Sequence, residues 1–275
     1  MQPAETADAV RAASAVAGSE GLEVGDVVVL QNSNKLTLRL LPADVLARVA
    51  PESDGILAFE VDLARRLAAV GSPAVALDPR VRPRVHARNG FGVTFWEFHP
   101  VREHPLSVGE YARALQRLHE DLRGLALPYT AVPHVTERVD RASRLLADRD
   151  RTPEVPEVDR TFLAAILTRL RDVAGRGPEQ VIHGEPHEGN VLATESGPRF
   201  VDLETCCRGP VEFDLAHAPD DVADHYPGLD PELLRDCRAL VLAIVTTWRW
   251  DRDDELPNGR ELGREWIAQL RALTG

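Results

Sequence analysis

A short polar segment between apolar runs carries the side chains most suited to chemistry. It spans His183–Asn190, and Asp202-Leu203-Glu204 follows further along the chain. Glu185 precedes Asn190 by five residues, and Asp202 follows Asn190 by twelve. A carboxylate can accept the proton of an attacking hydroxyl, whereas an amide and a second carboxylate offer hard oxygens to Mg²⁺ bridging nucleotide phosphates. The spacing therefore suits metal-assisted phosphoryl transfer, with Glu185 as base and Asn190 and Asp202 as metal ligands.

Two histidines beside Glu185 allow other kinds of site. His183 and Glu185 fit the H-x-E of zinc deaminases, but that chemistry needs a downstream P-C-x-x-C, which Cys206-Cys207 does not supply. His183 and His187 have the spacing of two zinc ligands on a helix, yet the glycine and proline between them break any helix there. We therefore expect both histidines to support the loop by hydrogen bonding rather than to react.

The first hundred residues show the pattern of a small antiparallel sheet with one internal helix. Short apolar or alternating runs, typical of strands, cover Val27–Leu30, Leu36–Leu40 and Val45–Val49. Apolar residues then recur at steps of three and four across residues 56–70, which predicts a helix. Asn89-Gly90 lies between two further apolar runs and suits a type I′ hairpin turn. A helix near the N-terminus is expected to precede these strands.

Helical signals dominate after residue 99. Ser107 and Glu110 form a capping box for one helix, and Asp230-Pro231 is typical of the start of another. Short strands are expected at residues 181–182, 191–193 and 200–203, the last carrying Asp202. We predict an α+β fold with two lobes. Residues 1–98 would form the N-lobe with the sheet, and residues 99–275 the larger, mostly helical C-lobe.

Length and charge restrict the class of protein. The 275 residues give ample interior for a core. The net charge of −12, from 32 Lys and Arg against 44 Asp and Glu, repels nucleic acids and attracts cationic partners. The longest apolar stretch is too short to cross a bilayer, and the N-terminus lacks the layout of a signal peptide. We expect a cytoplasmic monomer without nucleic-acid or membrane partners.

At the polar segment the sequence resembles the aminoglycoside phosphotransferase family, whose relatives include protein kinases and choline kinases. The family signature is H-G-D-x-x-x-x-N followed by a strand with D-x-E, which His183–Asn190 and Asp202–Glu204 match except at Glu185. Gly209-Pro210 and Asp214-Leu215 are similar to the G-D-P and D-L-A elements that follow. The resemblance covers roughly residues 22 to 220 and implies a bilobal, protein-kinase-like fold.

The resemblance also implies a nucleotide site in the N-lobe. Arg48 would hold the α- and β-phosphates, Glu60 would be its ion-pair partner, and residues 96–98 would lie where the hinge receives the adenine ring. The implied nucleotide-binding residues are Ser33, Asn34, Arg48, Glu60, Trp96, Glu97 and Phe98. The implied supporting residues are His183, His187, Glu204 and Asp214. Without the resemblance, Arg48 and Glu60 are read as solvated surface charges.

The activity implied is Mg²⁺-dependent transfer of the γ-phosphoryl group of ATP or GTP to a hydroxyl of a small molecule. An aminoglycoside or another hydroxylated antibiotic or metabolite is expected, and with it a role in antibiotic resistance. A choline-like amine, an amino alcohol or a sugar is the alternative acceptor. The net charge favours a cationic one. A further candidate for binding such an acceptor is an acidic run beside two tryptophans, which comprises Asp251, Asp253, Asp254 and Glu255. The alternative reading of this run is the solvated end of a packed helix.

Three departures from the family pattern affect the interpretation. Glu185 stands where the family usually has Asp, and its extra methylene displaces the carboxylate. The loop Gln31–Asn34 lacks the usual glycines, and Arg48 replaces a lysine with a planar fork. The alternative to an enzyme is therefore a nucleotide-binding, pseudokinase-like regulatory module. An acidic scaffold without a nucleotide site is a third possibility.

Overall fold

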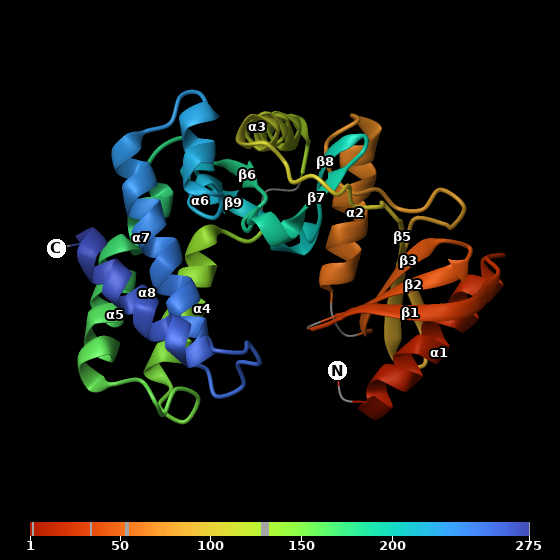
Figure 1. The fold of residues 1–275 in the computed structure, drawn as a ribbon, viewed down its shortest axis with the longest axis horizontal. Coiled ribbons are helices and arrows are strands. Elements are labelled where there is room, and N and C mark those ends of the chain that lie inside the picture. Colours follow the sequence, from red (N-terminus) through yellow and green to blue (C-terminus); the bar gives the residue numbers. More distant parts are fainter. Residues whose placement is uncertain (2, 34, 53–54, 128–131, 275) are drawn as a thin grey trace. The chain divides into compact units, whose positions relative to one another are not determined.

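The computed structural model describes residues 1, 3–33, 35–52, 55–127 and 132–274. Figure 1 shows their order along the chain. The elements are α1 (Pro3–Ser19), β1 (Val24–Asn32), β2 (Leu36–Pro42), β3 (Val45–Pro51), α2 (Ile56–Ala69), β4 (His86–Arg88), β5 (Phe91–Glu97), α3 (Val108–Gly124), α4 (Val135–Ala147), α5 (Glu157–Leu170), η2 (Arg171–Gly175), β6 (Gln180–Ile182), η3 (Glu188–Asn190), β7 (Val191–Thr194), β8 (Gly197–Phe200), η4 (Leu203–Thr205), β9 (Cys207–Gly209), α6 (Val211–Leu215), η5 (Asp220–His225), α7 (Pro231–Trp248) and α8 (Gly259–Thr274).

The chain divides into two compact units. Unit 1 comprises Met1–Glu110 and Asn190–Glu204, and unit 2 comprises Tyr111–Gly189 and Thr205–Gly275. The lobe boundary at residue 98 stays a prediction.

Unit 1 is built on an antiparallel sheet of strand order β1-β2-β3-β5-β4. Alternate residues of β2 and β3 are buried. These buried residues, among them Leu38, Val45 and Ala47, form a core with α1. Side chains of a strand alternate between its two faces, so Arg48 lies on the face opposite that core. The expected sheet, internal helix and N-terminal helix are confirmed.

The predicted turn at Asn89-Gly90 is confirmed. It joins β4 and β5, and both residues have positive φ, 53° for Asn89 and 79° for Gly90. A type I′ turn requires positive φ at both central positions, which asparagine and glycine adopt most readily. Next to this turn, a Cβ on Gly92 would lie 2.8 Å from the Cδ1 of Leu57. The absence of a side chain at Gly92 therefore lets α2 pack closely on β5.

The hairpin β7–β8 belongs to unit 1 although it lies far along the sequence. Backbone hydrogen bonds join Phe200 to Pro73 at 2.8 Å and to Val75 at 3.0 Å. The strand predicted over residues 200–203 is wrong in extent, since β8 ends at Phe200. Asp202 has φ 59°, a left-handed conformation that no strand accommodates, and a 3₁₀ turn follows at residues 203–205.

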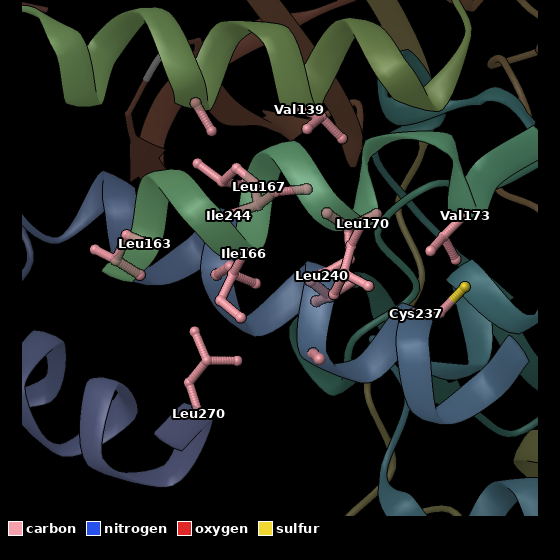
Figure 2. Close-up of a cluster of buried hydrophobic side chains, with 14 of the residues drawn as sticks. Val139, Leu163, Ile166, Leu167, Leu170, Val173, Cys237, Leu240, Ile244 and Leu270 are labelled. Carbon is pink, nitrogen blue, oxygen red and sulfur yellow. The ribbon is translucent and has the colours of Figure 1, made fainter. Parts of the chain in front are cut away.

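Unit 2 is mostly helical, and its core lies between α4, α5, α7 and α8. Figure 2 shows the buried side chains that these helices bring together, with Leu240 of α7 among those of α5. The predicted helix starts are confirmed. Ser107 and Glu110 cap α3 reciprocally, and Asp230 accepts hydrogen bonds from the first turn of α7. The sequence did not predict the pairing of β6 with β9.

The expected α+β class is confirmed, with an antiparallel sheet in the N-terminal part and helices dominating the remainder. Among the described residues, no helix is both long and apolar enough to span a membrane.

Leu240 tests the helical core. It is fully buried, so Leu240→Ala removes apolar contacts and leaves a cavity, which lowers the free energy of unfolding by about 2–5 kcal/mol. Urea denaturation followed by circular dichroism measures this change. Leu273→Ala is the matched control, because Leu273 is 45% exposed and its truncation shifts stability by about 0.5 kcal/mol at most. Equal effects of the two substitutions would contradict the packing described.

Candidate active site

The two proposed metal ligands lie at one end of the β7–β8 hairpin. Val191 and Phe200 form the last pair of the hairpin, and the carbonyl of Asn190 accepts a hydrogen bond from the N–H of Val201 at 3.0 Å. Asp202 comes directly after that bond, and its left-handed backbone turns the chain out of the strand. Antiparallel pairing has thus brought an amide and a carboxylate, twelve residues apart in sequence, to the same strand ends.

Arg48 connects the end of the β7–β8 hairpin to α2. Its guanidinium donates to Glu60 of α2 and, at 2.5 Å, to the Oδ1 of Asp202. Glu60 is fully buried, so it is not the solvated charge that its sequence context alone suggests. The ion pair that the resemblance implies is therefore present, and Arg48 spans the two carboxylates.

Lys35 is a second cation at this place, and the sequence analysis missed it. Its Nζ lies 2.9 Å from the Oε2 of Glu60 and also contacts Glu204. Only 4% of Lys35 is exposed. Burial lowers the pKa of Lys35, and the neighbouring carboxylate of Glu60 opposes that shift. A signal existed in the sequence, because Lys35 is the only lysine among 32 basic residues.

These residues form what we call the unit 1 ion cluster: Lys35, Arg48, Glu60, Asp202 and Glu204. It holds three carboxylates and two cations, and such buried charges are stable only when paired. Asp202 is its most accessible carboxylate, with 33% of the side chain exposed. Carboxylate and amide oxygens are ligands that Mg²⁺ prefers, and Mg²⁺ completes its shell with phosphates and water. Asp202 and Asn190 therefore fit a nucleotide-bound Mg²⁺.

The described residues contain no group of three or more His, Cys, Asp or Glu side chains that could hold a metal ion by themselves. The proposed set of one carboxylate, from Asp202, and one amide, from Asn190, is smaller than such a group. It matches the way Mg²⁺ is bound through one or two protein ligands plus substrate phosphates.

The other implied nucleotide contacts differ in accessibility. Ser33 lies between β1 and β2, where its N–H bonds the carbonyl of Lys35 at 3.1 Å. Trp96 is 2% exposed, and its indole N–H donates to Thr94 at 2.9 Å, so its ring packs inside unit 1. Phe98 follows β5, with the guanidinium of Arg39 over its ring at 3.7 Å. Two further predicted residues complete this set: Glu97, the half-buried end of β5, and Asn34, which lies outside the described residues.

In unit 2 the segment around Glu185 begins where β6 ends, and hydrogen bonds to Asp214 hold the backbone of this segment in place. The carboxylate of Asp214 accepts the N–H of His183 at 2.8 Å and that of Gly184 at 2.7 Å. The Nε2 of His119 donates to the same carboxylate at 2.8 Å. Burial raises the pKa of Asp214, but the hydrogen bond from His119 and the charges around it outweigh burial and hold the pKa below its ordinary value.

Gly184 is required by the backbone at this point. Its φ is 89°, and a Cβ there would lie 2.2 Å from the carbonyl oxygen of Thr205. A residue with a side chain therefore clashes with fixed backbone, not with a flexible side chain. His183 is fully buried, and its Nδ1 faces the hydroxyl of Thr205 at 3.3 Å. The conformation that presents Glu185 thus depends on a glycine and a buried histidine.

Arg138 of α4 holds Glu185, and this partner was not predicted. Its guanidinium donates to the Glu185 carboxylate and also bonds the carbonyls of Gly184, at 3.3 Å, and Thr205. Glu185 is partly exposed, with 37% of its side chain accessible. The longer side chain of glutamate, compared with aspartate, thus ends in a carboxylate that the Arg138 guanidinium holds. Nothing in the spacing of Arg138 relates it to Glu185, which lies 47 residues away.

His187 makes a hydrogen bond within its own loop, and part of the acidic run pairs with arginines. His187 is exposed, and its ring accepts the N–H of Gly189 at 3.1 Å. Asp251 pairs with Arg151 at 3.1 Å, and Asp254 pairs with Arg249 at 3.2 Å. The remaining two members are exposed: Asp253, which lies 3.5 Å from Arg252, and Glu255. Arginines thus neutralise much of the negative charge that this run shows in the sequence.

The fold is protein-kinase-like. Residues 29–271 match the phosphotransferase enzyme family. The chain belongs to this family, and it is a phosphotransferase with an alcohol group as acceptor. It matches none of the curated protein sequences.

Solved structures with the same fold include several small-molecule kinases. An amicoumacin kinase in complex with AMP-PNP, Ca²⁺ and Ami has a TM-score of 0.75 and 12% identity, over 99% of this chain and 97% of that chain. A choline/ethanolamine kinase family protein from Mesorhizobium loti has a TM-score of 0.65 and 18% identity, over 98% of this chain and 94% of that chain. The GDP complex of aminoglycoside 2′-phosphotransferase-IIIa has a TM-score of 0.68 and 14% identity, over 95% of this chain and 99% of that chain. At these identities the likeness shows the protein-kinase-like fold.

Lys35 tests the ion cluster. Lys35→Met removes one of the two cations that neutralise the buried Glu60, so we expect the free energy of unfolding to fall by about 3 kcal/mol. Urea denaturation measures the change. Lys35→Arg retains the charge and is the control, with a smaller loss expected. If Lys35→Met were as stable as the wild type, the proposed pairing would not be what stabilises this cluster.

Asp214 tests the brace through pH. A carboxylate with a lowered folded pKa stabilises the folded state above its unfolded pKa, about 3.9, and this contribution disappears as pH falls through the folded pKa. Asp214→Asn should therefore be less stable than the wild type at pH 7, with the difference narrowing below about pH 4. Urea denaturation at a series of pH values measures it. Asp221→Asn, at an exposed position, is the control. A difference that stays constant with pH would contradict the brace.

Proposed function

We propose that this phosphotransferase transfers the γ-phosphoryl group of ATP or GTP to a hydroxyl of a hydroxylated antibiotic, such as an aminoglycoside, or of a hydroxylated metabolite. The observation that carries the proposal is the end of the β7–β8 hairpin. There the residues that carry an amide and a carboxylate, Asn190 and Asp202, lie at paired strand ends, and Arg48 links the carboxylate to the buried Glu60. Such a site binds a divalent cation together with the phosphates of a nucleotide.

Mg²⁺ is the proposed cofactor, held by Asn190 and Asp202. When bound, it neutralises the charge that develops on the phosphates. Arg48 is the proposed phosphate-binding residue. Its guanidinium is held by Glu60, which also pairs with Lys35. Most of the rate would then come from positioning and charge neutralisation, as is general for phosphoryl transfer.

Glu185 is the proposed base. The acceptor oxygen forms a bond to the γ-phosphorus while the bond between that phosphorus and the β,γ-bridging oxygen breaks, and the nucleoside diphosphate leaves. The acceptor proton passes to the Glu185 carboxylate. Arg138 fixes that carboxylate, and Asp214 fixes the backbone that carries it. The partial exposure of Glu185 leaves it accessible to an acceptor.

The structural neighbours support this class of reaction. They include kinases named for amicoumacin and for choline or ethanolamine, and complexes with AMP-PNP or GDP. Phosphorylation of an antibiotic would make the protein a resistance enzyme. Because nucleoside triphosphates are cytoplasmic, we propose that the protein acts in the cytoplasm.

Variants at the metal and base positions test the proposal. Asp202→Ala should abolish transfer while the protein stays folded, and it should remove the rise in Tm that Mg²⁺-ATP or Mg²⁺-GTP produces in the wild type. Glu185→Gln should retain that rise but lower kcat by about a hundredfold or more, since it removes the proton acceptor. Transfer is measured by mass spectrometry of phosphate adducts across a panel of hydroxylated antibiotics and metabolites.

Two exposed positions supply matched controls, Asp26→Ala in β1 and Glu261→Gln in α8. Both should behave as the wild type in transfer and in Tm. Full transfer by Asp202→Ala would refute the metal assignment. A Tm rise without transfer to any acceptor would support the pseudokinase-like alternative instead.

A further inference from the structure

A pocket of about 280 Å³ lies beside α4 and the end of α7 in unit 2. Its lining residues are Arg141, Arg144, Leu145, Asp148, Arg151 and Trp248. Half of them are arginines, although the chain as a whole carries a net charge of −12. The indole of Trp248 forms part of the wall, and the guanidinium of Arg141 lies over its ring at 5.1 Å. The pocket thus combines an aromatic surface with concentrated positive charge.

Two of the three arginines have charge available for a ligand. Arg151 is engaged by Asp251 at 3.1 Å. Arg141 and Arg144 are exposed, and neither forms an ion pair with any carboxylate in the described part of the chain.

The carboxylates near this pocket are already engaged. Asp148, which lines it, accepts the backbone N–H groups of Asp150 and Arg151 at 3.0 and 3.1 Å. Asp140, on the same helix, pairs with Arg171 at 2.7 and 2.9 Å. Arg141 and Arg144 therefore bring two positive charges without a salt-bridge partner among the described residues, against the one carboxylate of the lining, Asp148.

The pocket lies on the helix that holds the proposed base. Arg138, Arg141 and Arg144 follow one another at three-residue steps along α4, and Arg138 donates to Glu185. Residues three apart on a helix are neighbours on its surface. At 1.5 Å per residue, Arg141 and Arg144 lie about 4.5 and 9 Å along the axis from Arg138. This axial interval between Arg138 and the pocket arginines is within the length of a small molecule.

We propose that this pocket binds an oxyanion group, a carboxylate or a phosphate, of the acceptor substrate. The proposal deepens the proposed function and rests on it. Arg141 and Arg144 bind the oxyanion through charge-assisted hydrogen bonds, for which the planar guanidinium fork is suited. An apolar or aromatic part of the acceptor packs on Trp248. The hydroxyl to be phosphorylated then reaches Glu185.

The charge near the pocket and the net charge of the chain predict acceptors of opposite charge. The net charge of −12 favours a cationic acceptor. Charges farther away than a Debye length, about 8 Å at physiological ionic strength, are largely screened, so the groups lining the pocket decide. Three aspartates that could attract a cation lie against arginines: Asp251 and Asp253 against Arg151, and Asp254 against Arg249. An acceptor with an acidic group therefore fits this face better than a polycation does.

The activity arm of the test compares acceptors that differ only in the acidic group. Each acceptor found in the mass-spectrometric panel is compared with its amide or dephosphorylated counterpart, and carboxylate and phosphate compounds form separate arms. In the wild type, removal of the acidic group should lower kcat/KM by about tenfold or more. In Arg141→Gln/Arg144→Gln this preference should disappear. Arg113→Gln/Arg235→Gln, at two exposed positions on α3 and α7, is the matched control and should retain it.

The binding arm does not depend on transfer. Calorimetric titration with 4-(hydroxymethyl)benzoate, 4-(hydroxymethyl)phenyl phosphate and 4-(hydroxymethyl)benzamide compares the two acids with a neutral counterpart at low ionic strength. At least one acid should bind the wild type about tenfold more tightly than the amide. Arg141→Gln/Arg144→Gln should remove that difference, and the control variant should keep it.

Equal binding of the acids and the amide by the wild type, or an acid preference that survives Arg141→Gln/Arg144→Gln, would overturn the pocket assignment. Accepted substrates that are all cationic, without an acidic group, would overturn its assignment to the acceptor. Absence of transfer to every compound would instead refute the proposed function. In that case the calorimetric result alone decides whether the pocket binds oxyanions.

Discussion

The buried carboxylate of Glu60 is the charge on which the arrangement of unit 1 depends. A carboxylate removed from water is stable only if cations and hydrogen bonds replace its hydration. Lys35 precedes β2 and Arg48 lies in β3, so the two cations tie α2 to two neighbouring strands. Arg48 also reaches Asp202, so that the same charge places the end of the β7–β8 hairpin. The charges that hold unit 1 together and the proposed metal ligand Asp202 thus belong to one network.

Unit 2 uses a similar device for the loop that carries the proposed base. Asp214 is fully buried and satisfies two backbone N–H groups that no strand or helix could satisfy, those of His183 and Gly184. The loop can therefore leave β6 in a conformation without regular hydrogen bonds. Arg138 then orients the side chain of Glu185 from α4. In each unit a buried acid fixes the backbone or the cation, and the acid with the proposed reactive role is more exposed.

Sequence reasoning located the proposed reactive groups because their spacing is local. Glu185, Asn190 and Asp202 lie within one loop and hairpin, and turn residues and apolar runs indicate such elements well. It misjudged the extent of the last strand, since the left-handed backbone of Asp202 is set by its surroundings in the fold. It missed Lys35 and Arg138 because each acts on a carboxylate distant in sequence. No local pattern encodes such a pairing.

The amino-acid sequence by itself determined the family, the order of strands and helices, and the side chains that suit phosphoryl transfer. These follow from short-range periodicity, turn chemistry and motif spacing. The tertiary structure decided which charges neutralise one another. It paired the acidic run near residue 251 with arginines and left two arginines of α4 facing a pocket. Electrostatic attraction depends on distance in space and on burial, and folding sets both across parts of the chain that are far apart in sequence.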